Sequence, residues 1–170
     1  PQIIKGFGGL SNVQIGLINA FPYLVGAIAM IFWTRASDRM KERKWFVQIP
    51  LLCIVAGLLI AANTSAPVPK MAAVTLAAFG IFSALPTFWT LPTAFLSGTA
   101  AAAGIAWINS IGNLGGYIGP TIFGSLKDKM GNDVYAVMFL ASLAVVAFLL
   151  VLFMRHDSRA EGFEITAPSR

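Results

Sequence analysis

Five runs of apolar residues, each long enough to cross a lipid bilayer, make up most of this 170-residue chain. A hydrocarbon core of about 30 Å needs about 20 helical residues, and lipid tolerates only helices and closed barrels as spanning structures. Charged residues make up 11% of the chain, against about 25% in soluble domains. We therefore expect an all-α integral membrane protein with transmembrane helices at about 13–33, 45–62, 70–96, 100–126 and 134–154.

The basic residues lie between these runs, which is typical of topology determinants and argues against nucleic-acid binding despite a net charge of +5. If the spans alternate, residues 34–44 carry five cations and residues 155–170 carry three, so eight share one face. The other four are Lys5, Lys70, Lys127 and Lys129. The positive-inside rule then predicts that the Thr34–Lys44 loop and the tail 155–170 lie in the cytoplasm. We expect Trp33 and Trp45 at the level of the lipid headgroups, and the protein in the inner membrane of the cell.

The fourth run contains residues that a span in plain lipid does not need. Asn109 and Asn113 are four residues apart and share a helical face, where hydrocarbon offers their amides no partner. They can line a substrate path or hydrogen-bond to a neighbouring helix. Pro120 predicts a bend in this helix. Small residues at spacings of four predict close helix packing, and they are Gly112, Gly115, Gly116 and Gly119.

The third run adds an aromatic and hydroxyl-bearing turn between two prolines. Trp89 can contact a substrate, with its indole N–H available to a carboxylate, or sit at the cytoplasmic headgroups. Thr90 is a weaker candidate because threonine often hydrogen-bonds back to its own helix. Tyr117, one turn beyond Asn113, can face the same cavity or lie between helices.

The basic loop has two interpretations. It can serve only as a positive-inside anchor. Alternatively, Asp38 can pair with the guanidinium of Arg39 or Arg43 and latch two helices on one side of the membrane.

Residues 13–33, 45–62, 71–126 and 134–154 contain no Asp, Glu, Lys, Arg or His. A proton-coupled carrier needs a titratable group in the membrane, so that group and any substrate-binding cation must lie elsewhere in a longer polypeptide. Enzyme signatures are also absent from the sequence: no G-x-S-x-G and no phosphate-binding glycine loop occur, and one His and one Cys make no metal cluster. We expect no enzymatic activity and no cofactor.

Two segments, SDRMKERKWFVQIPLLC and ALPTFWTLPTAFLSGTAAAAGIAWINSIGNLGGYIGP, resemble the C-terminal half of a major facilitator superfamily transporter. They are most similar to the anion:cation symporter family, which includes tartrate, phthalate and 4-hydroxyphenylacetate permeases. The basic segment departs from the family pattern in having Thr34 and Lys41 where glycine is often found.

The resemblance implies that residues 1–154 form helices eight to twelve, and the end of helix seven, of a twelve-helix fold. It also implies proton-coupled symport of a small organic anion by alternating access, with the N-terminal half of the same polypeptide as partner. Substrate-binding roles then go to Trp89, Thr90, Asn109, Asn113 and Tyr117. The alternative is a membrane protein that does not transport, such as a sensor or a fragment that only packs.

Overall fold

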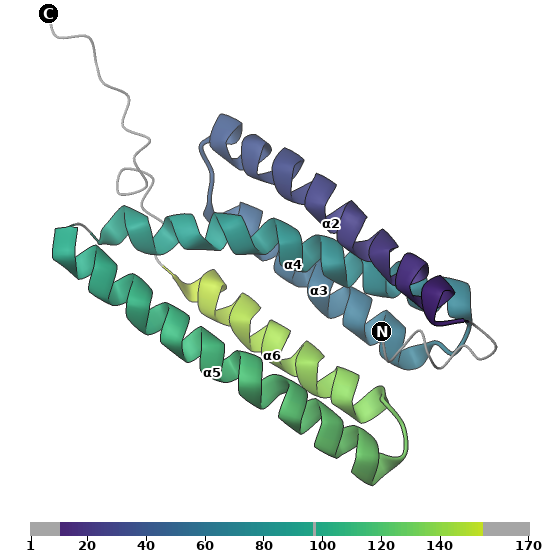
Figure 1. Ribbon diagram of the computed structural model, residues 1–170. Coiled ribbons are helices and arrows are strands. Elements are labelled where there is room, and N and C mark those ends of the chain that lie inside the picture. Colours follow the sequence, from purple (N-terminus) through teal and green to yellow (C-terminus); the bar gives the residue numbers. More distant parts are fainter. Residues whose placement is uncertain (1–10, 97, 155–170) are drawn as a thin grey trace, which may run out of the picture.

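The computed structural model describes residues 11–96 and 98–154, and nearly all of them are helical. Five helices follow one another: α2 (Asn12–Met40), α3 (Lys44–Asn63), α4 (Pro67–Phe95), α5 (Gly98–Met130) and α6 (Val134–Phe153) (Figure 1). The expected end of a preceding span at residues 1–5 and the tail 155–170 lie outside the described residues. The all-α prediction is confirmed.

Each predicted span coincides with a helix, and α2 continues beyond the expected end of its span into the basic segment. Residues Thr34–Met40 continue α2, and only residues 41–43 connect it to α3. Alanine, arginine and methionine are good helix formers, so this helix continues beyond the apolar run that defined the span. Lys41 ends it with φ +54°, in the left-handed region that favours glycine.

Four helices in the described residues are long and apolar enough to cross a membrane: Gly16–Met40, Lys44–Asn63, Pro67–Pro92 and Val134–Phe153. The segment predicted at 100–126 is a helix of sufficient length but does not belong to this set. Its two amides and its glycines lower its hydropathy. A membrane-spanning role for α5 therefore stays a prediction.

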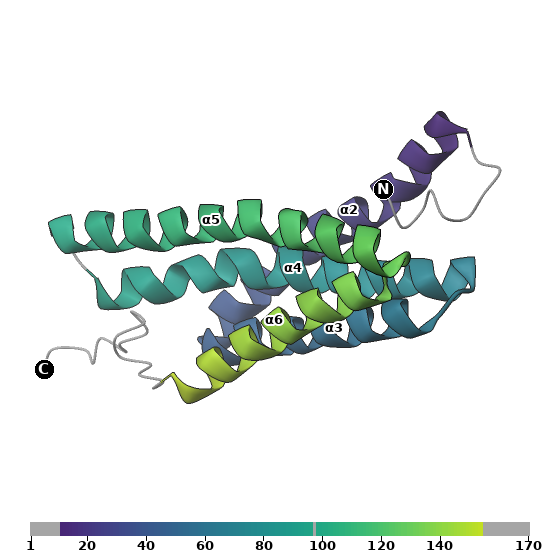
Figure 2. The same cartoon turned by 90° about the horizontal axis from the view of Figure 1, so that it is seen from below.

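The core of the bundle is the antiparallel pair α3 and α4. α2 packs mainly on α4, α6 packs on α3, and α5 contacts chiefly α6 (Figure 2). Small residues allow the central pair to approach closely: a Cβ on Gly57 would lie 2.6 Å from the Ala73 carbonyl oxygen, and one on Gly80 would meet the Pro50 carbonyl. The described chain thus forms a compact set of four helices with α5 at its edge.

Trp33 joins three helices near one end of the bundle. Pro50 has no N–H, so the carbonyl of Phe46, four residues earlier, loses its helical donor. The Trp33 indole Nε1 donates a 2.8 Å hydrogen bond to that carbonyl. Its ring also contacts Phe46 and, at 5.6 Å between centroids, Phe79 of α4. This tryptophan was expected only at the headgroups, and the structure gives it an additional packing role.

Candidate functional site

Three predicted site residues lie along one exposed side of α5. Asn109, Asn113 and Tyr117 repeat at four-residue intervals, which aligns them along the helix. Gly112 and Gly116 lie between them on the same face, and all five residues are exposed. None of the residues of α5 is buried. The sequence prediction that these side chains share one surface is therefore consistent with the helix that the structure shows.

The four predicted packing glycines of α5 do not contact the described part of this chain. A Cβ built on any of the four predicted packing glycines (Gly112, Gly115, Gly116 and Gly119) would meet nothing within 4 Å. The close glycine contacts among the described residues occur instead at Gly26, Gly57, Gly80 and Gly104, which the sequence interpretation did not single out. A packing role for the α5 glycines stays a prediction, and it needs a partner other than the helices described here.

Pro120 adds an acceptor to the exposed face of α5. It lies inside the helix and cannot donate to the carbonyl of Gly116, four residues earlier. The α5 face thus offers two side-chain amides, a phenol and a backbone carbonyl without its helical donor. This combination can donate to and accept from a polar solute, and it carries no charge of its own.

The aromatic turn of α4 remains helical through both prolines. Trp89 is half-buried, and its ring contacts Phe88 edge-on with centroids 5.6 Å apart. The Thr90 hydroxyl donates to the Thr87 carbonyl at 2.7 Å, the back-bonding that made this residue the weaker candidate. Trp89 and Thr90 lie near the end of α4, and residues 96–97 connect that helix to α5.

The predicted pairing at the basic connection is present. The Arg43 guanidinium contacts the Asp38 carboxylate, so the last turn of α2 is tied to the residue that precedes α3. Arg43 is largely buried whereas Asp38 is about half exposed. The Ser37 hydroxyl, which is fully buried, donates to the Glu42 carbonyl and closes the same turn. Arg39 lies exposed in the last turn of α2, and a role in gating for any of these residues stays a prediction.

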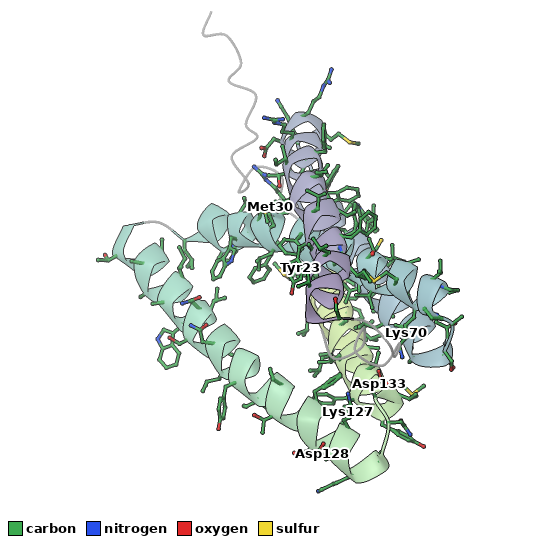
Figure 3. All side chains as sticks on the ribbon, turned by 45° about the vertical axis from the view of Figure 1, so that its right-hand side comes forward. Tyr23, Met30, Lys70, Lys127, Asp128 and Asp133 are labelled. Carbon is green, nitrogen blue, oxygen red and sulfur yellow. The ribbon has the colours of Figure 1, made fainter. Side chains whose placement is uncertain are left out.

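A second ion pair, which the sequence interpretation missed, lies at the opposite end of the bundle. Lys70 in the first turn of α4 and Asp133 in the α5–α6 connection are 3.4 Å apart, Nζ to Oδ2. Their side chains point toward one another (Figure 3), and both are mostly buried, with 15% and 23% exposed. The sequence offered one indication of this pair: both residues lie at the start of predicted spans, and both starts were expected on the same side of the membrane.

The profile of the Major Facilitator Superfamily matches residues 1–168. The chain belongs to the major facilitator superfamily. This superfamily member is thus a multi-pass membrane protein, and the proteins that it resembles are transporters rather than enzymes.

Among the similar proteins, a putative tartrate transporter of Agrobacterium vitis is 45% identical over 93% of this chain and 35% of its own length. A second putative tartrate transporter of that organism is 43% identical over 97% of the chain and 38% of its own length. A quinolone resistance transporter of Acinetobacter baumannii is 40% identical over 88% of the chain and 35% of its own length. The chain thus spans little more than a third of these relatives. No solved structure matches it significantly.

Proposed function

We propose that this chain is part of a secondary transporter that carries a small organic carboxylate across the inner membrane by alternating access. The observation that carries the proposal is the exposed α5 face with Asn109, Asn113 and Tyr117 in a membrane-embedded chain. Polar groups at membrane depth generally face a bundle interior or a water-filled path. Relatives named as putative tartrate transporters support a carboxylate as the substrate class.

The rest of the proposed transporter has to supply the charge. Amide groups and an indole can orient a carboxylate, but they do not neutralise it. Residues 13–33, 45–62, 71–126 and 134–154 contain no Asp, Glu, Lys, Arg or His. We propose that a cation and a proton-binding group come from the N-terminal half of the same polypeptide, and that this half covers the α5 face. The matched relatives are long enough to contain such a half.

In this proposal the ends of the bundle control access. Residues 34–44 and the C-terminus are assigned to the cytoplasm, so the Asp38–Arg43 pair lies on the cytoplasmic side. The Lys70–Asp133 pair then lies on the outer side. Asp38→Asn is expected to slow transport while leaving substrate binding intact, because the pair lies outside the binding face.

Uptake by the full-length protein in proteoliposomes tests the proposal. Radiolabelled tartrate, an aromatic carboxylate and a quinolone are offered with and without an inward proton gradient. The proposal predicts carboxylate uptake that accelerates when the gradient is imposed and collapses with a protonophore. Carboxylate uptake that ignores the gradient would contradict proton coupling, and transport of the quinolone alone would contradict the substrate class.

A further inference from the structure

An apolar groove lies between α3, α4 and α6. Its volume is about 340 Å³, within the range of about 300–1,000 Å³ that ligand sites occupy. All three helices contribute to its lining, and every lining side chain is hydrophobic. They include Val47, Leu51, Ile81, Phe88, Val151 and Met154. A surface of this kind accepts a hydrocarbon chain and offers nothing to a polar solute.

A cation is held at one end of this groove. Lys44 begins α3, one turn before Val47. Its ammonium group donates to the carbonyls of Leu152 and Met154, each at 2.8 Å. Since Met154 also lines the groove, the charge lies beside the groove's end. These two hydrogen bonds cap the C-terminus of α6 and fix the position of the ammonium group.

The Lys44 ammonium keeps the capacity to bind an anion. An ammonium group has three donors, and the two carbonyls occupy two of them. Trp45, the next residue, is 53% exposed and is typical of the level at which lipid headgroups lie. The groove and its end thus combine a hydrocarbon surface, a fixed positive charge and an interfacial aromatic residue.

We propose that this groove binds one anionic phospholipid, with an acyl chain between α3, α4 and α6 and the phosphate on Lys44. Charge complementarity at the groove's end selects the anionic headgroup, and the hydrophobic lining selects the chain. Membrane-embedded helices are always in contact with such lipids, which are the main source of anionic charge at the membrane surface. The proposal concerns a site separate from the polar face of α5.

Native mass spectrometry of the full-length protein, titrated with phosphatidylglycerol or phosphatidylcholine of identical chains, tests this site. The intact protein is expected to bind phosphatidylglycerol about fivefold more tightly, the preference that one cation at an anionic surface provides. Lys44→Gln should abolish that preference, whereas Lys44→Arg should retain it. Lys41→Gln is the matched control, because it removes a cation from the same connection without affecting the groove. Ala147→Phe fills the groove and should weaken binding of both lipids.

Three results would overturn the proposal. The first is equal binding of both lipids by the intact protein, which would mean that the groove holds any hydrocarbon chain. The second is the same loss of preference in Lys41→Gln as in Lys44→Gln, which would mean that the charge acts through the general surface potential. The third is full displacement of the lipid by glycerol phosphate with Ala147→Phe unaffected, which would mean that Lys44 binds free phosphate and the groove is not used.

Discussion

Removing the indole N–H of Trp33 is expected to loosen the junction of α2, α3 and α4. Trp33→Phe retains a ring against Phe46 and Phe79 but deletes the donor that the Phe46 carbonyl receives in place of the helical one removed by Pro50. Hydrogen bonds between membrane helices contribute about 0.6 kcal/mol on average and up to about 1.7 kcal/mol. An unsatisfied buried acceptor costs about 1–3 kcal/mol.

We expect Trp33→Phe to lower the free energy of unfolding by about 1–2 kcal/mol. This is near the upper end of the values for membrane helices, because the backbone of α3 cannot supply a replacement donor for the Phe46 carbonyl. Trp45→Phe is the matched control. That indole is 53% exposed, and its substitution should change the free energy of unfolding by less than about 0.5 kcal/mol.

A double-mutant cycle isolates the hydrogen bond from other effects of the substitution. Pro50→Ala restores an N–H that can donate to the Phe46 carbonyl. In that background Trp33→Phe should cost little, so the two changes should couple by about 1 kcal/mol or more. The free energies can be measured by reversible denaturant unfolding in mixed micelles. Equal costs of Trp33→Phe with and without Pro50 would refute the reasoning.

Three further substitutions test separate parts of the bundle. In the same unfolding assay, Lys41→Gly should be more stable than Lys41→Ala by about 1 kcal/mol, because a φ of +54° strains any residue with a Cβ. Equal stabilities of the two variants would contradict this. Gly57→Ala should destabilise the bundle by about 1–3 kcal/mol, since its Cβ would lie 2.6 Å from a carbonyl oxygen of α4, whereas Gly112→Ala should not. Lys70→Gln should lower the apparent melting temperature slightly, and the decrease should be smaller at high salt. Exchanging the two residues, with Asp at position 70 and Lys at position 133, should restore the melting temperature; no recovery would argue against the ion pair.

The helices of this chain could be predicted from its sequence because lipid imposes a simple rule of length and hydropathy. The end of α2 could not, since charged residues that leave the membrane can remain helical, as Thr34–Met40 do. The Asp38–Arg43 pair was foreseeable from charges five residues apart around a short connection. The Lys70–Asp133 pair required knowledge that the start of α4 meets the α5–α6 connection, because 63 residues separate its members.

The packing partners of the glycines could not be predicted from the sequence either. A small-residue pattern identifies where a backbone can approach but not which helix approaches it. Gly57 and Gly80 lie against backbone atoms across the α3–α4 interface, although no sequence pattern singles them out. Gly112 and Gly116 form the clearer pattern, yet they lie on a face that the described helices leave open. The sequence of α5 therefore predicts a packing surface that the described helices do not cover.

The most direct test of the central claim, that the α5 face contacts the transported solute, is uptake by full-length variants with matched expression. Asn109→Ala and Asn113→Ala remove the two amides of that face. Asn63→Ala is the control, because this amide lies at the end of α3 and hydrogen-bonds to the Leu59 carbonyl of its own helix. We predict at least a tenfold loss of uptake for Asn109→Ala, about 1.4 kcal/mol of lost interaction, and normal uptake for Asn63→Ala. Unchanged uptake in Asn109→Ala, Asn113→Ala and Trp89→Ala would contradict the account.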